Sequence, residues 1–154
     1  MARPKITLYV DTVSPFGYIA YYLLRHEEAF KACDITYVPI LLGGLMNKCG
    51  NTPPLKIKIL NPHHPNPPAR LPAPTLPIMR VLCAVEASDK ENANNGKNLT
   101  RALDTFYARY WVDAVATHKP EGFKETLEGL FGRRKREDVR LKTLPLSLVS
   151  IQTN

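Results

Sequence analysis

Proline is concentrated in the middle of this chain: nine of its 14 prolines lie between Pro53 and Pro77. Proline lacks the N–H that regular secondary structure uses, and it disfavours helix at its own position and at the residue before it. We therefore predict a proline-rich linker over residues 55–74, which divides the 154-residue chain into two parts. An irregular segment of this length is unusual within one compact domain.

The part before the linker is typical of a strand–helix–strand unit. Residues 5–13 alternate apolar and polar side chains, and Ser14-Pro15 suits the cap and first position of a helix over residues 15–32. Residues 35–42 are a second strand, and Gly43-Gly44 predicts a turn after it. This order favours two parallel strands and an α/β fold. The apolar stripe expected on the helix comprises Phe16, Ile19, Ala20, Leu23 and Leu24.

The part after the linker is predicted to be helical. Apolar residues recur at helical spacing over residues 75–87 and 99–111, and Pro120 starts a third, shorter helix. From Arg140 onward the sequence has no firm periodicity. Two strands are too few for a sheet that stands alone, so we expect the helices to cover more of it than usual. The aromatic stripe predicted to pack in the helical core comprises Phe106, Tyr107, Tyr110 and Trp111.

Composition excludes several classes of protein. The chain is 44% hydrophobic and 23% charged, which argues against general disorder, and no apolar run has the length of a membrane span. No secretory signal is expected at the N-terminus, and three widely spaced cysteines favour a reduced, intracellular compartment. A net charge of +7 suits an anionic ligand, nucleic acid or an acidic surface. The basic run at 133–136 predicts a solvated helix end, with a nuclear-import or RNA patch as the alternative.

The junction between the first strand and its helix is the most informative position for function. Ligands of open α/β sheets bind at the carboxyl ends of strands, next to the N-termini of helices. Backbone N–H groups and the positive end of the helix dipole favour an anion or a thiolate there, and a serine hydroxyl can donate to a bound sulfur. Ser14 occupies this position, where a simple helix cap is the alternative.

Three blocks of sequence resemble the kappa-class glutathione transferases. These enzymes belong to the DsbA-like branch of the thioredoxin superfamily, together with the 2-hydroxychromene-2-carboxylate isomerases. The first block, VDTVSPFGY at residues 10–18, resembles their catalytic turn. The second, GGLMNKCGNTPP at 43–54, resembles their glutathione-contacting loop, and TLPIMRVLCAV at 75–85 resembles a helix start in their inserted helical domain.

The resemblance assigns roles to individual residues. Ser14 is implied to be the catalytic residue that hydrogen-bonds the sulfur of glutathione, with Pro15 and Phe16 shaping the same pocket. Asn51 is implied to bind the glutathione backbone. Two lysines of the linker, Lys56 and Lys58, are candidates for pairing with a glutathione carboxylate, although solvated loop lysines are the simpler interpretation.

The same resemblance implies a thioredoxin-like (DsbA-like) fold with an inserted helical subdomain. Residues 1–54 would be the thioredoxin-like βαβ portion, 75–139 the inserted helical subdomain and 140–154 an atypical tail. The resemblance covers residues 5–54 and 75–135, so the C-terminal part of the sheet is expected to be missing from a shortened chain. Leu144-Pro145 is the candidate for the cis-proline loop of the family.

The implied activity is glutathione transfer in detoxification, in which the glutathione thiolate conjugates or reduces an electrophilic or peroxide substrate. Glutathione is the co-substrate, the second substrate is a small hydrophobic electrophile, and a homodimer is expected. We expect no metal, because His63-His64 lacks a third ligand, and no nucleic acid or membrane span. The resemblance implies a mitochondrial or peroxisomal location, with the cytoplasm as the alternative. The alternative functions are a 2-hydroxychromene-2-carboxylate isomerase-like enzyme and an inactive truncated product.

Overall fold

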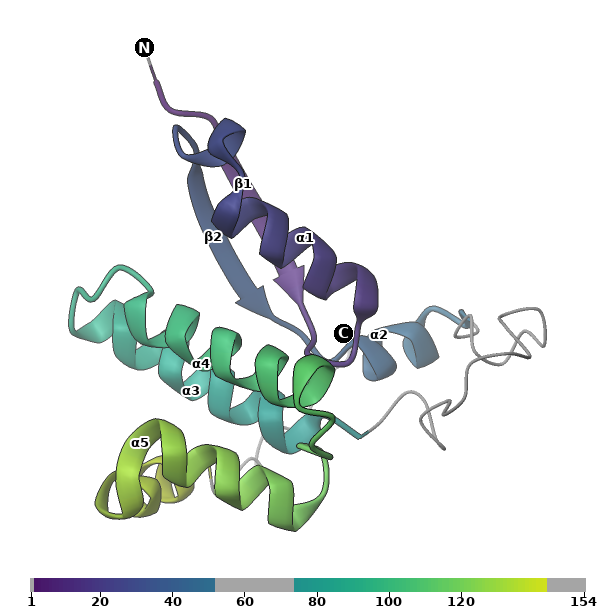
Figure 1. Ribbon diagram of the computed structural model, residues 1–154, viewed down its shortest axis with the longest axis vertical. Coiled ribbons are helices and arrows are strands. Elements are labelled where there is room, and N and C mark those ends of the chain that lie inside the picture. The colour runs from purple at the N-terminus through teal and green to yellow at the C-terminus, as the bar shows by residue number, and fades with distance from the viewer. Residues whose placement is uncertain (1, 52–73, 144–154) are drawn as a thin grey trace, which may run out of the picture. The chain divides into compact units, whose positions relative to one another are not determined.

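The chain folds into two compact units, Met1–Met79 and Arg80–Asn154 (Figure 1). The computed structural model describes residues 2–51 and 74–143, without the side chains of 133–143. The predicted linker over 55–74 thus falls almost wholly outside the described residues. Within the described ranges, no helix combines the length and the apolar character that crossing a bilayer requires.

The first unit contains the predicted βαβ arrangement. Strand β1 (Lys5–Val10) leads into helix α1 (Pro15–His26), and β2 (Asp34–Pro39) pairs with β1 in parallel (Figure 1). The register joins Lys5 to Asp34 at one end and Val10 to Pro39 at the other. The carboxyl ends of both strands therefore meet at the same edge, as an α/β ligand site requires.

The face of α1 that is buried differs from the expected one. Tyr21 is 3% exposed, and its ring lies 5.0 Å from the ring of Tyr37 on β2. Phe16 and Ile19, two members of the predicted stripe, are instead 75% and 54% exposed. Two strands form a narrow surface, which explains why only a narrow part of the helix is covered.

Several local predictions in this unit were wrong: β1 ends at Val10 instead of residue 13, and β2 ends at Pro39 instead of residue 42. Helix α1 ends at His26, because Glu27 adopts an extended backbone before the short 3-10 helix η1 (Glu28–Phe30). Gly43-Gly44 does not form a turn but lies within helix α2 (Leu42–Lys48). The turn chemistry of two glycines is overridden here because a carboxylate distant in the sequence accepts a hydrogen bond from the start of α2.

The second unit is helical. Helix α3 (Leu76–Glu91) begins in the first unit and continues into the second, followed by α4 (Lys97–Tyr107), the π-helix η3 (Ala108–Val112) and α5 (Pro120–Thr143). Helix α5 starts at the predicted proline but is interrupted at Gly132, where φ is +71°. Its residues 140–143 are helical, although the sequence showed no periodicity there.

The predicted packing of the aromatic stripe in the core of the second unit is confirmed for part of the stripe. Phe106 and Tyr107 are buried, and the ring of Phe106 lies 6.3 Å from that of Phe123 on α5. Tyr110 and Trp111 are only half-buried, because the α-helix gives way to η3 after Tyr107. Among the described side chains of this unit, the buried apolar ones are Val81, Leu82, Val85, Leu99, Ala102, Leu103, Phe106, Tyr107, Leu127 and Leu130.

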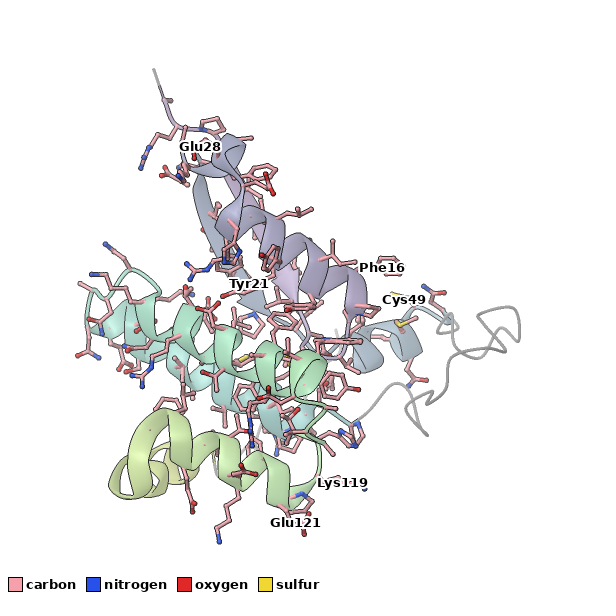
Figure 2. The ribbon with its side chains drawn as sticks, viewed as in Figure 1. Phe16, Tyr21, Glu28, Cys49, Lys119 and Glu121 are labelled. Atoms are coloured by element: carbon pink, nitrogen blue, oxygen red, sulfur yellow. The ribbon has the colours of Figure 1, made fainter. Side chains whose placement is uncertain are left out.

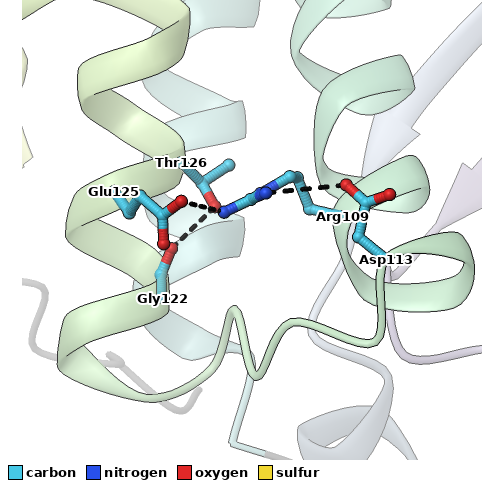
Figure 3. Close-up of polar contacts among 5 residues, drawn as sticks. All are labelled: Arg109, Asp113, Gly122, Glu125 and Thr126. Atoms are coloured by element: carbon cyan, nitrogen blue, oxygen red, sulfur yellow. Dashed lines mark hydrogen bonds and ion pairs between the residues drawn. The ribbon is translucent and has the colours of Figure 1, made fainter.

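A half-buried arginine connects η3 to α5 within the second unit. The guanidinium of Arg109 pairs with Glu125 on α5 and lies 3.6 Å from Asp113 (Figure 3). Its backbone carbonyl accepts a hydrogen bond from Val115 at 2.8 Å. Charge pairing and a backbone contact together hold the turn that leads into α5.

Two glycines of α5 provide a matched test of this packing. A Cβ at Gly122 would lie 2.6 Å from the carbonyl oxygen of Ala116, whereas a Cβ at Gly129 would meet no atom within 4 Å. Alanine favours a helix over glycine by about 1 kcal/mol. We expect Gly129→Ala to raise the free energy of unfolding in urea by up to that amount, and Gly122→Ala to lower it. Equal stabilisation by both substitutions would contradict the close approach at Gly122.

Candidate functional site

Ser14 caps helix α1 directly after the end of β1. Its backbone is extended, with φ −81° and ψ 115°, and its hydroxyl oxygen accepts a hydrogen bond from the N–H of Gly17 at 3.0 Å. Pro15 occupies the first helical position, where its missing N–H costs nothing. The cap predicted from the sequence is thus confirmed.

Capping does not exhaust the hydrogen-bonding capacity of this hydroxyl. A serine hydroxyl carries one O–H donor in addition to its acceptor lone pairs, and the cap at Gly17 uses the oxygen as an acceptor. The side chain of Ser14 is half-buried, so its hydrogen is available to a group that approaches from solvent. The start of α1 also presents the positive end of its dipole. This combination suits an anionic partner, a thiolate included.

Pro15 and Phe16, the two residues implied to shape the pocket, are both exposed at the start of α1. Figure 2 shows the Phe16 ring projecting away from the helix, consistent with its exposed fraction of 75%. A phenyl ring in this position presents a large apolar face to solvent in the first turn of α1. The roles of both residues in binding a ligand remain predictions.

Asn51 is held in place by the end of α2. Gly50 has φ of +65° and donates its N–H to Asn47, while the N–H of Asn51 donates to the Met46 carbonyl at 2.9 Å. This pair of bonds is the Schellman motif, which ends a helix where a glycine can adopt the left-handed conformation. The motif uses the backbone of Asn51 and leaves its exposed amide side chain directed to solvent.

A buried carboxylate that the sequence interpretation missed joins the two segments carrying Ser14 and Asn51. Asp11 is 2% exposed, and its Oδ1 accepts from the N–H of Val13 at 3.3 Å. Its Oδ2 accepts from the N–H of Leu42 at 2.8 Å and from the hydroxyl of Thr75 at 2.9 Å. The sequence signal for this role was an acidic residue directly after β1, three residues before the helix cap at Ser14.

The environment of Asp11 sets its protonation behaviour. Burial raises the pKa of Asp11 above its ordinary value of 3.8, because a charged carboxylate is poorly solvated there. The hydrogen bonds from Leu42, Thr75 and Val13 favour the ionised form and limit this rise in pKa. Burial thus disfavours the charged carboxylate, and its hydrogen bonds partly offset this penalty.

The other groups singled out in the sequence lie away from these contacts or outside the described residues. The three cysteines are free thiols: Cys33 is half-buried, whereas Cys49, two residues before Asn51, and Cys83 are exposed. In the described part of the chain, no three His, Cys, Asp or Glu side chains come together as a metal site would need. Six residues singled out in the sequence lie outside the described ranges: Lys56, Lys58, His63, His64, Leu144 and Pro145.

Comparison with known proteins gives one informative match. The chain is 26% identical over 147 residues, or 82% of its length, to the curated protein glutathione S-transferase kappa 1 of Caenorhabditis elegans. It spans 62% of the length of that relative. No family model matches the chain, and no solved structure matches it.

The hydrogen bond between Gly17 and the Ser14 hydroxyl is expected to stabilise the folded chain. We expect Ser14→Ala to lower the free energy of unfolding by about 1 kcal/mol, because Gly17 loses its acceptor, whereas Ser14→Gly costs only a few tenths. Urea denaturation of both variants measures the difference. An alanine variant as stable as the unmodified chain would show that the observed bond does not act as a cap.

The raised pKa of Asp11 predicts how stability changes with pH. Between 3.8 and the raised pKa, the folded chain keeps a proton that the unfolded chain has released, so this residue's contribution to stability falls as pH rises. We expect the unfolding free energy of the unmodified chain, minus that of Asp11→Asn, to decrease as the pH rises from 3.8 through the raised pKa of Asp11. Denaturation at a series of pH values tests this, since the variant does not titrate at this position. An increase over the same range would mean that the ionised form is favoured by folding.

Proposed function

The chain is a relative of the kappa-class glutathione S-transferases, and we propose that it is itself a glutathione transferase. The observation that carries the proposal is the serine at the start of α1. Its hydroxyl oxygen caps the helix through Gly17, and its hydrogen is left to donate. Ser14 is also the residue to which the resemblance assigned the sulfur of glutathione.

The proposed fold is thioredoxin-like, with the helices after residue 75 as an inserted subdomain. Support comes from the parallel pairing of β1 with β2 and from α1 as the connection between them. This arrangement puts the start of α1 at the carboxyl edge of the strands, where α/β proteins bind their ligands.

The proposed role of Ser14 is to stabilise the thiolate of glutathione. A thiol with an ordinary pKa of about 8.5 is only a few per cent ionised near pH 7. Lowering that pKa by about two units requires roughly 2.7 kcal/mol of preferential interaction with the thiolate. A charge-assisted hydrogen bond from the hydroxyl, together with the dipole of α1, is of the right size to supply it.

The proposed binding residues are Pro15, Phe16 and Asn51. The Asn51 amide has both a donor and an acceptor, which matches the peptide groups of glutathione. Phe16 offers an exposed apolar face near Ser14 for the methylene groups of the ligand or for the second substrate. In the conjugation step the thiolate attacks an electrophilic carbon, a carbon–sulfur bond forms, and the leaving group departs with the bonding electrons.

Binding and ionisation of glutathione test this proposal directly. We expect calorimetry to show saturable binding that Asn51→Ala weakens roughly tenfold, the effect of about 1.4 kcal/mol from lost hydrogen bonds. We expect an ultraviolet pH titration to show a depressed thiol pKa in the complex with the unmodified chain, which Ser14→Ala and Ser14→Gly both return toward about 8.5.

The glycine variant is the control for helix stability, because it removes the hydroxyl but destabilises the helix by only a few tenths of a kcal/mol. Absence of binding at millimolar glutathione would reject the proposal. A normal thiol pKa in the complex with the unmodified chain would reject the role of Ser14 while leaving glutathione as a ligand. Isomerisation of a hydroxychromene carboxylate without consumption of glutathione would indicate the alternative enzyme.

A further inference from the structure

Asp11 receives hydrogen bonds from three segments that are far apart in the sequence. The donors are the N–H groups of Val13 and Leu42 and the hydroxyl of Thr75, at separations of 2, 31 and 64 residues. All of these residues belong to the first unit of the chain. The carboxylate is therefore a single point at which the geometry of three segments is fixed together.

The bond to Val13 shapes the turn that delivers Ser14. Asp11 accepts the N–H of Val13 with its side chain, and its backbone carbonyl accepts the N–H of Ser14 at 3.1 Å. The Oδ1 atom and the backbone carbonyl of Asp11 thus both act on the connection between β1 and α1. The position of the Ser14 hydroxyl follows from this turn and from the cap at Gly17.

The bond to Leu42 fixes the other side of the proposed site. Leu42 is the first residue of α2, and the preceding residue, Leu41, provides no side-chain cap. A helix start leaves N–H groups without partners, and a carboxylate there also interacts favourably with the helix dipole. Asp11 supplies the missing acceptor from a distant part of the sequence. The Schellman motif at the far end of the same short helix then places Asn51.

Burial of the Asp11 carboxylate opposes folding through the loss of its hydration. Burial of Asp11 raises its pKa, which shows that the charge is poorly solvated. Transfer of a carboxylate from water into the protein interior carries a desolvation penalty, which hydrogen bonds only partly offset. The carboxylate instead fixes the geometry of three segments. No apolar side chain could do this, because none can accept hydrogen bonds from Val13, Leu42 and Thr75.

We propose that Asp11 is a positioning residue for the glutathione site and that the hydroxyl of Thr75 holds its carboxylate in the required orientation. This inference rests on the proposed function, because the site it positions is the one built on Ser14 and Asn51. Asp11 acts through these two residues and does not itself contact the substrate.

Thr75 offers the cleanest substitution, because valine has nearly the same shape as threonine and lacks the hydroxyl. Thr75→Val removes the donor to Asp11, and Thr75→Ser restores it as the matched control. We expect Thr75→Val to weaken glutathione binding by calorimetry about fivefold, the equivalent of one hydrogen bond, with Thr75→Ser close to the unmodified chain.

A double-mutant cycle separates positioning from a general loss of stability. In the Asn51→Ala background, Thr75→Val should weaken binding by a smaller factor than in the unmodified chain, because one of the two groups that it misplaces is already absent. A residue that only stabilises the fold would lower affinity equally in both backgrounds, or not at all. Additive effects, or unchanged affinity in Thr75→Val, would overturn the proposal.

Amide hydrogen exchange in the absence of glutathione tests the positioning role of Asp11 independently of the proposed function. We expect Thr75→Val to speed exchange at Val13, Leu42 and Gly17 more than at the amides of β1, and Thr75→Ser to restore the original rates. Absence of glutathione binding with this pattern of exchange would reject the function and support the role of Asp11 in arranging the site. Uniform or unchanged exchange across the first unit would reject that role whatever glutathione does.

Discussion

The first unit depends on a buried carboxylate that satisfies backbone groups belonging to separate elements. Asp11 provides an acceptor for the turn before α1 and for the uncapped start of α2, and Thr75 is tied to the same group. Asp89 does the same in the second unit, where it accepts from the side chain of Asn98 and the N–H of Leu99 at the start of α4. In both units an aspartate from another element completes a helix start that lacks its own cap.

This arrangement explains how a small sheet can support a defined site. Parallel pairing brings the ends of β1 and β2 to one edge, and Asp11 connects the turn after β1 to the helix after β2. The Ser14 hydroxyl caps α1 with its oxygen and keeps its hydrogen for the proposed ligand. Fixed hydrogen bonds of this kind allow a donor to meet a developing or bound negative charge without reorganising first.

Local chemistry determined which features could be predicted from the sequence. Alternating strands, the Ser14 cap and a helix beginning at Pro120 are decided by neighbouring residues, and they were found. Helix α2 was missed because Gly43-Gly44 favours a turn, and the acceptor that stabilises its start lies 31 residues away. The exposure of Phe16 also could not be foreseen, since helical spacing does not reveal how much surface a partner covers.

The central claim is that glutathione binds where α1 begins and α2 ends. Its most direct test is a titration of the isotopically labelled full chain with glutathione, followed through the chemical shifts of the backbone amides. We expect the amides of residues 12–17, Pro15 aside, and those of 49–51 to shift together and to saturate with one dissociation constant. Shifts confined to α4 and α5, or no shifts at millimolar glutathione, would contradict it.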